Sequence, residues 1–156
     1  RIPCPRTING AHQCSDKSWN QVERREIRVG GAIRRCVWAH PTQKGDLHIA
    51  FENVVFGDAL QGNHGLADRS FGNKKLHGST EVKVFINEEE VASLSPSRKK
   101  EWQAFKIDTS GFEGTTGTLE WVVSARNTGK QHYCFDVQPV QGTTVERPDA
   151  FDEESP

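Results

Sequence analysis

The chain has 156 residues, of which 34% are hydrophobic and 26% charged, and its formal net charge at pH 7 is −1. This length fits a single domain with a short appendage. The near-zero net charge argues against nucleic acid as a partner, and no apolar run approaches the ~18 residues of a membrane-spanning helix. Residues 1–45 are strongly basic and the remainder is acidic. We expect paired strands from the two parts to compensate each other's charge, with a basic binding arm as the alternative.

Alternation of apolar and polar residues predicts short β-strands along most of the chain. They are expected within 27–38 (interrupted at Gly30–Gly31), 47–56, 81–86, 91–94, 102–107, 118–125 and 131–137. Only residues 95–101 have helical capacity, for at most one turn. The pattern predicts an all-β fold, an antiparallel β-sandwich of jelly-roll type with about eight strands and little or no helix. The apolar faces of these strands predict a buried core of Trp38, Phe51, Val84, Phe105, Ile107, Trp121, Val123 and Phe135.

Two stretches depart from the strand pattern. Residues 57–78 contain five glycines and are expected to form one long loop, which in a compact domain is typical of a functional segment. Residues 142–156 are expected to be an acidic linker or disordered tail. We therefore divide the chain into an N-terminal extension (1–26) closed by a disulfide, a β-sandwich domain (27–141) and the tail.

Four cysteines predict two disulfides and hence an oxidising compartment. We favour Cys4–Cys14, which closes a short loop rich in turn formers, and Cys36–Cys134, which joins a strand near the start of the chain to one near its end. The first residue is Arg1 and methionine is absent, so we expect a mature or excised segment that has lost any targeting signal. The expected location is extracellular, cell-surface or periplasmic.

A structural zinc site is the alternative for the second pair of cysteines. Cys36 and His40, together with His132 and Cys134, would supply the two sulfur and two nitrogen ligands of such a site. Neither half has the Cys-x-x-Cys spacing of a zinc knuckle, which favours the disulfide.

No catalytic signature is present, neither a nucleophile elbow, a P-loop, a His-Glu-x-x-His motif nor a dinucleotide fingerprint. Carboxylates for glycosidic cleavage would have to be assembled from distant strands, for example from Glu52, Glu120 and Asp136. We therefore predict that the chain is not an enzyme, with a small secreted hydrolase as an alternative.

Three segments of the second half carry a family resemblance. Residues 101–110 (EWQAFKIDTS), 119–125 (LEWVVSA) and 133–136 (YCFD) resemble the last three strands of a galactose-binding-domain-like jelly roll. This resemblance implies a sandwich of the type found in carbohydrate-binding modules that are attached to enzymes or exposed on bacterial surfaces. The Cys4–Cys14 loop is no part of that pattern, and the variable loops of such modules allow no binding residue to be carried over.

The expected function is therefore that of a secreted or surface-exposed, non-catalytic binding module, with carbohydrate as the ligand class. Its partner would be a glycan or another cell-surface component, without nucleic acid or membrane insertion, and we expect a monomer. Such a module can be an accessory domain of a larger protein. The alternative is a structural or adhesive protein–protein interaction domain, which would show a contiguous apolar patch.

The segment 61–73, within the expected long loop, is the predicted ligand site. It combines amide, imidazole, carboxylate, guanidinium and aromatic groups, which together can bind sugar hydroxyls and stack on a sugar face. The predicted ligand-binding residues are Asn63, His64, Asp68, Arg69, Phe71 and Asn73. The alternative is a solvated loop whose apolar residues cover the end of the sandwich and whose charges pair with neighbours.

The resemblance also implies a structural Ca²⁺, which modules of this kind often carry where loops meet. Oxygen ligands would come from aspartates in loops or at strand ends, for which we single out Asp46 and Asp136. Further candidates by position are Asp58, Asp68 and Asp108. The alternative role of all these residues is turn formation, for which aspartate is common.

Overall fold

A computed structural model describes residues 3–42, 45–71, 79–126 and 131–142. Its strands are β1 (His12–Gln13), β2 (Gln21–Val29), β3 (Ala32–Ala39), β4 (Leu47–Val55), β5 (Ala59–Leu66), β6 (Ser79–Ile86), β7 (Glu89–Leu94), β8 (Gln103–Asp108), β9 (Thr116–Arg126) and β10 (Tyr133–Val140). Two 3-10 turns, η1 (Asp68–Phe71) and η2 (Ser110–Phe112), are the helical segments of the described part, and neither could cross a membrane.

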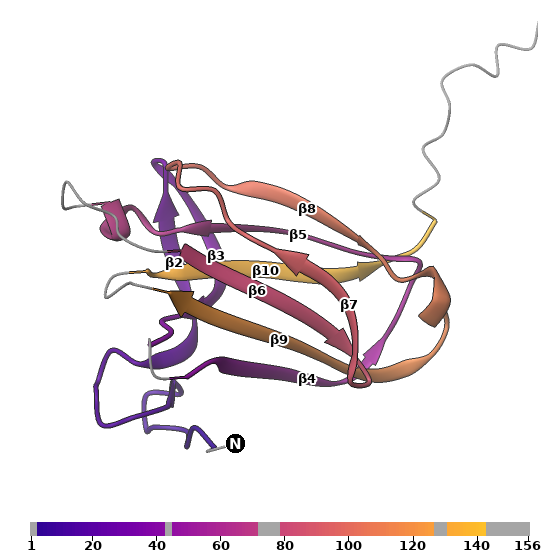
Figure 1. The fold of residues 1–156 in the computed structure, drawn as a ribbon, viewed down its shortest axis with the longest axis horizontal. Coiled ribbons are helices and arrows are strands. Elements are labelled where there is room, and N and C mark those ends of the chain that lie inside the picture. Colours follow the sequence, from indigo (N-terminus) through magenta and orange to yellow (C-terminus); the bar gives the residue numbers. More distant parts are fainter. Residues whose placement is uncertain (1–2, 43–44, 72–78, 127–130, 143–156) are drawn as a thin grey trace, which may run out of the picture.

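The strands form two antiparallel sheets that pack face to face (Figure 1). A six-stranded sheet has the order β1-β2-β3-β10-β5-β8, and a four-stranded sheet has the order β4-β9-β6-β7. The predicted all-β antiparallel sandwich with little helix is confirmed.

Alternating side chains fill the main core between the sheets. On β9, Trp121 and Val123 are fully buried, and the Trp121 ring stacks on Phe135 of β10 with 4.7 Å between ring centroids. The predicted core residues that are buried are Trp38, Val84, Ile107, Trp121, Val123 and Phe135. The other two, Phe51 and Phe105, are only partly buried because β4 and β8 are edge strands.

Strand β10 carries side chains of two separate clusters on its two faces. Tyr133 and Phe135 point into the main core, whereas Cys134 belongs to a smaller cluster on the other face of the six-stranded sheet, together with Trp38. Cys134 is bonded to Cys36 of the neighbouring strand β3, so the predicted long-range disulfide is confirmed. The zinc alternative is wrong, since both sulfurs are used in this bond.

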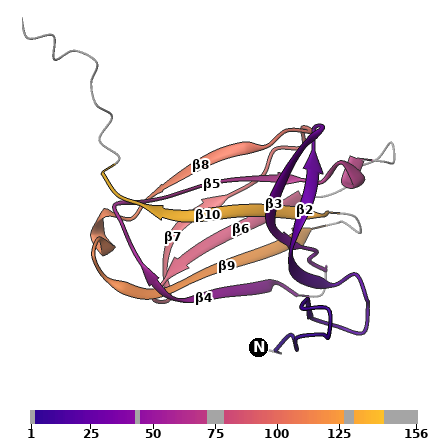
Figure 2. The same cartoon turned by 180° about the vertical axis from the view of Figure 1, so that it is seen from behind.

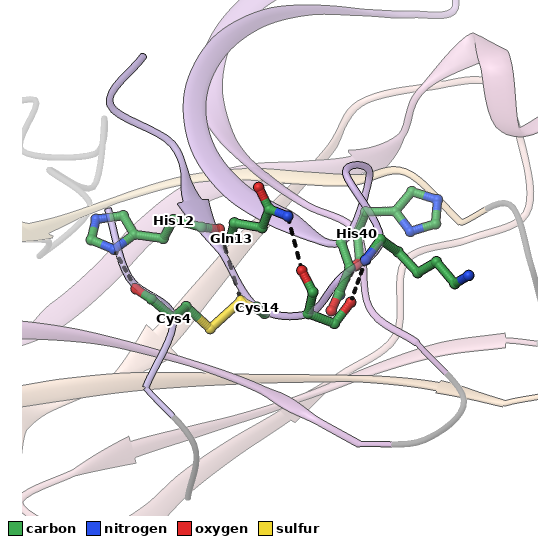
Figure 3. Close-up of a disulfide and its surroundings, with 8 residues drawn as sticks. Cys4, His12, Gln13, Cys14 and His40 are labelled. Carbon is green, nitrogen blue, oxygen red and sulfur yellow. Dashed lines mark hydrogen bonds between the residues drawn. A yellow bond between two sulfur atoms is a disulfide. The ribbon is translucent and has the colours of Figure 1, made fainter. Parts of the chain in front are cut away.

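The N-terminal loop is closed by the predicted Cys4–Cys14 disulfide (Figure 3). Nδ1 of His12 lies 3.2 Å from the carbonyl oxygen of Cys4. The buried Asn20 connects this loop to the sandwich: its carbonyl accepts from the Cys14 N–H, and its side-chain amide donates to the carbonyl of His40 at 2.8 Å. The division of the chain at residue 26 stays a prediction.

The expectation of a long loop over 57–78 is wrong for residues 59–66. They form β5, an interior strand of the six-stranded sheet that pairs with β10 on one side and β8 on the other. Glycines suggested a loop, but Gly62 is required by packing: a Cβ there would collide with the carbonyl of Asp136 and the ring of Phe105. Residues 72–78 lie outside the described part of the chain.

Removing the two disulfides should destabilise the fold to different extents. The double variant C36A/C134A should lower the free energy of unfolding by about 4–5 kcal/mol, because in the chain-entropy model a longer closed loop constrains the unfolded chain more. The Cys36–Cys134 bridge joins residues 98 apart, whereas Cys4 and Cys14 are 10 apart. The matched variant C4A/C14A should therefore lose only about 2–3 kcal/mol. Urea unfolding measures both, and equal losses would contradict this explanation.

Candidate functional site

The six residues predicted to bind ligand are divided among different elements. Asn63 and His64 lie on β5, whereas Asp68, Arg69 and Phe71 come together on the η1 turn that follows. The sixth, Asn73, lies outside the described residues. The structure therefore groups three of the six on one turn and separates them from the two on the strand.

His64 is buried in a polar chain of the main core. Its Nδ1 lies 3.0 Å from the Tyr133 hydroxyl, and that hydroxyl accepts from Nε1–H of Trp121 at 3.3 Å. Since indole can only donate, the Tyr133 proton is directed to His64, which then holds its own proton on Nε2. The ring also packs edge-on against Phe105, and burial lowers the pKa of His64 to about 4. The structure thus places this imidazole inside the sandwich, where the site prediction needed it at the surface.

Asp68 holds a turn of the neighbouring hairpin. Gly30 and Gly31 form the two-residue turn between β2 and β3, and both have positive φ values (59° and 82°), which suit glycine. The Asp68 carboxylate accepts from the Gly30 N–H at 2.6 Å and, more weakly, from the Gly31 N–H at 3.4 Å. These contacts fasten η1 to the tip of the hairpin.

The two aspartates singled out for calcium lie in different parts of the fold. Asp46 precedes β4, and Asp136 lies on β10, where its carboxylate accepts from the Asn63 N–H at 3.0 Å and from Nε of Arg34 at 3.2 Å. No group of three or more His, Cys, Asp or Glu side chains that could hold a metal ion occurs in the described residues. The expected Ca²⁺ stays a prediction, and these two aspartates do not come together to form its site. Glu120, named with Asp136 for hydrolysis, lies on the other sheet.

A hollow of about 720 Å³ lies on the outer face of the four-stranded sheet, and sequence reasoning did not identify its residues as a site. The register places six outward side chains there as a grid, with Ala50, Glu120 and Phe85 in one row and His48, Val122 and Lys83 in the next. We call this arrangement the outer-face grid. Asp46, Asn87, Glu88 and Thr118 complete the lining.

Apolar and polar groups alternate within the outer-face grid. Val122 is only 6% exposed although it points away from the main core, so it forms an apolar floor. Phe85 is partly buried beside it. Nδ1 of His48 lies 3.1 Å from Oε1 of Glu120, so the contact orients both groups across strands β4 and β9 of the grid. An apolar floor surrounded by oriented polar groups is the usual construction of a small-molecule site.

A second group of aromatic residues lies beside the Cys36–Cys134 disulfide. His132 stacks on Trp38 (ring centroids 5.8 Å apart) and contacts the edge of His40 at 4.5 Å, and Trp19 packs against His40. Nδ1 of each histidine is buried and makes no hydrogen bond within the described residues. Burial, helped by His40 and nearby arginines including Arg69, lowers the pKa of His132 to about 4.

Comparison with known proteins finds similar folds among solved structures but no related sequence. The sequence matches no protein-family model and no curated protein. Among solved structures, the tandem CBM51 modules of Sp3GH98, a family 98 glycoside hydrolase from Streptococcus pneumoniae SP3-BS71, match 83% of this chain and 44% of that chain with a TM-score of 0.56 and 8% identity. CBM51-2 with the INT domains of Clostridium perfringens ZmpB, in complex with GlcNAc, matches 72% of this chain at a TM-score of 0.48 and 14% identity.

This chain corresponds to only 23% of that ZmpB chain. The CBM51 of Clostridium perfringens GH95 in complex with methyl-galactose matches 72% of this chain and 77% of that one, with a TM-score of 0.46 and 15% identity. At such identities the likeness concerns the fold alone, and the Streptococcus pneumoniae modules carry it. The chain has the fold of a carbohydrate-binding-module-like β-sandwich, as the resemblance over residues 101–137 implied.

Substitution of Asp68 should destabilise the protein, whereas substitution of a fully solvated loop residue should not. The variant Asp68→Ala leaves two backbone N–H groups of the β2–β3 turn without their carboxylate, so the free energy of unfolding should fall by about 1–2 kcal/mol. Asp68→Asn retains one acceptor oxygen and should lose less. Thermal unfolding measures both, and an unchanged Asp68→Ala variant would contradict the structural role.

Stability should decrease in weak acid because of the buried histidines. His64 and His132 have folded-state pKa values near 4, below the ordinary 6.5, so between these values the unfolded chain binds protons that the folded chain does not. The free energy of unfolding should thus fall as pH falls from about 6.5 to 4, by at most about 1.4 kcal/mol per pH unit for each histidine. The variant His132→Gln should flatten the slope of Tm against pH, whereas the exposed control His12→Gln should keep it. A slope that His132→Gln leaves unchanged would refute this assignment.

Proposed function

We propose that this chain is a non-catalytic carbohydrate-binding module whose sugar site is the outer-face grid. The observation that carries the proposal is the combination, in one hollow, of an apolar surface at Phe85 and Val122 with the oriented His48–Glu120 pair. A sugar ring offers C–H groups to the apolar surface and hydroxyls to the polar pair. The fold that the chain shares with carbohydrate-binding modules supports the same conclusion.

The charges of the hollow favour neutral or amino sugars. Asp46, Glu88 and Glu120 contribute three carboxylates, against one ammonium group from Lys83 and the imidazole of His48. This excess of negative charge disfavours uronic acids and sialic acids, because like charges repel in a partly enclosed site. Glycans without carboxylates are therefore the proposed substrate class for binding.

The two disulfides support an oxidising compartment, hence an extracellular, cell-surface or periplasmic location. The adhesive alternative is less well supported. The exposed large apolar side chains of the described residues, Ile8, Trp19, Ile33 and Val55, come from four separate segments rather than from one strand face. The role of an accessory domain in a larger protein is part of the proposal.

A glycan array of neutral, amino and acidic sugars tests this function, followed by titration of the best ligand. Phe85→Ala should weaken binding at least about tenfold, because it removes most of the apolar surface on which a sugar would stack. Glu120→Gln should also weaken it. Trp19→Ala is the matched control, since Trp19 is a partly exposed aromatic residue outside the hollow and should leave affinity unchanged.

Other results would relocate the site, change the proposed activity or overturn the proposal. Loss of binding in Trp19→Ala or Arg69→Ala, with Phe85→Ala unaffected, would move the site to the end of the sandwich that includes η1. Release of new reducing ends from the bound glycan would favour the hydrolase alternative. Absence of binding to every glycan would overturn the proposed function.

A further inference from the structure

The hairpin β2–β3 diverges from the rest of its sheet and opens a second cavity. Its strand β3 pairs with β10 only at Tyr133–Phe135, while β10 continues to pair with β5 up to Val140. Figure 2 shows the hairpin rising across the sandwich while β5 and β10 run along its length. A cavity of about 350 Å³ lies between this hairpin, β10 and the β4–β9 edge of the opposite sheet.

The floor of this cavity is the main core itself. Leu119 and Phe135, which line it, are 2% and 0% exposed, and the partly buried Phe51 meets Phe135 edge-on with 6.3 Å between ring centroids. Val54 and Val137 extend the apolar lining. An apolar group placed here would lie against the border of the main core, beside β4, the last strand of the four-stranded sheet on this side.

Two arginines stand over this floor. Arg24 and Arg35 line the cavity from neighbouring strands of the hairpin, on the same face as Val37. Neither forms an ion pair with any residue of the described part. Their neighbours differ: Arg34 pairs with Asp136 at 3.2 Å, and Arg25 with Glu23 at 3.2 Å.

The acidic groups near this rim leave the two guanidinium charges uncompensated. Asp136 also lines the cavity, but its carboxylate is already held by Arg34 and by a backbone N–H. Glu26 lies opposite Arg35 in the register, is exposed and does not line the cavity. The rim therefore presents net positive charge above an apolar floor.

We propose that this cavity binds a small amphiphilic carboxylate, an apolar body of about eight to ten carbon atoms whose carboxylate meets Arg24 and Arg35. Guanidinium groups bind carboxylates through paired hydrogen bonds, and partial desolvation above an apolar floor strengthens that contact. The ligand class differs from the sugar proposed for the outer-face grid, and the cavity lies on the other side of the four-stranded sheet. The two proposals are independent.

Titration of the full chain with three probes tests this site, using calorimetry together with two-dimensional NMR. Octanoate should bind at least about tenfold more tightly than octanol, which has the same body without the charge, and acetate, the head group alone, should not bind. Chemical-shift changes should map to Val54, Val137 and their neighbours. Excess glycan should not displace octanoate, which separates this test from that of the sugar site.

Variants distinguish a built site from general attraction to a basic surface. Arg24→Gln and Arg35→Gln should each weaken octanoate binding at least about fivefold and leave octanol unaffected. Arg28→Gln is the matched control, because Arg28 lies on the same face of β2, four residues from Arg24, outside the cavity lining. Val54→Trp should fill the cavity and abolish binding of both long probes, with an NMR spectrum confirming the fold.

Three results would overturn the proposal. The first is that octanoate does not bind at concentrations up to about 5 mM, at which even a site with a millimolar dissociation constant would be largely occupied. The second is acetate binding as tightly as octanoate, which would indicate surface attraction of anions only. The third is octanoate affinity that Arg24→Gln, Arg35→Gln and a folded Val54→Trp all leave unchanged.

Discussion

Strand β10 is the element on which the rest of this structure depends, because its two faces serve two different clusters. Tyr133 and Phe135 enter the main core, while Cys134 between them is bonded to Cys36 on the opposite face. A strand with side-chain period two can satisfy both clusters only in one register, since a slip by one residue would exchange them. The disulfide excludes that slip covalently. It also fixes β3 beside β10, whereas β5 is held on the other side of β10 by its own strand pairing.

The polar chain through Tyr133 adds a second constraint inside the main core. Trp121 comes from the four-stranded sheet, Tyr133 and His64 from the six-stranded one, so their hydrogen bonds join the two sheets at one point. Each member is buried, and breaking the chain would leave a polar atom without a partner in an apolar environment. This explains why His64 on β5 is buried in the core, although the sequence pattern suggested that it binds a ligand.

The two hollows have different structural origins. The four-stranded sheet is narrower, so the β2–β3 hairpin extends past its β4 edge and leaves a cavity with a basic rim. The outer-face grid depends instead on small or apolar outward residues, Ala50 on the edge strand β4 and Val122 on the neighbouring β9, among longer side chains. In each case a rigid β-framework holds the side chains, which is the usual basis of recognition on such folds. The Arg34–Asp136 ion pair joins the basic first part of the chain to its acidic remainder, whereas Arg24 and Arg35 form no ion pair within the described residues.

Local pattern was sufficient for those features that depend on near neighbours. The alternation at residues 81–86 and 118–125 predicted strands and inward faces correctly, because one buried face imposes period two on a strand. The pairing of Cys36 with Cys134 was also predicted from the strands that flank them, and that of Cys4 with Cys14 from the short turn-rich loop between them. Gly62 and Gly65 made β5 look like a loop in the sequence. Gly62 is needed because β10 and Phe105 approach it closely, and Gly65 because the backbone at Glu101 does. Only the assembled sheet creates these contacts.

The sequence by itself therefore determined the class of fold, the disulfides and most of the core, since these depend on residue type and spacing. The tertiary structure alone decided which side chains share a surface. His48 and Glu120 are 72 residues apart and become neighbours only through the register of β4 with β9. Arg24 and Arg35 reach the same cavity only because the hairpin leaves the sheet after three paired residues of β10. Binding sites on a sandwich are made by strand pairing between distant segments, and no local pattern records that pairing.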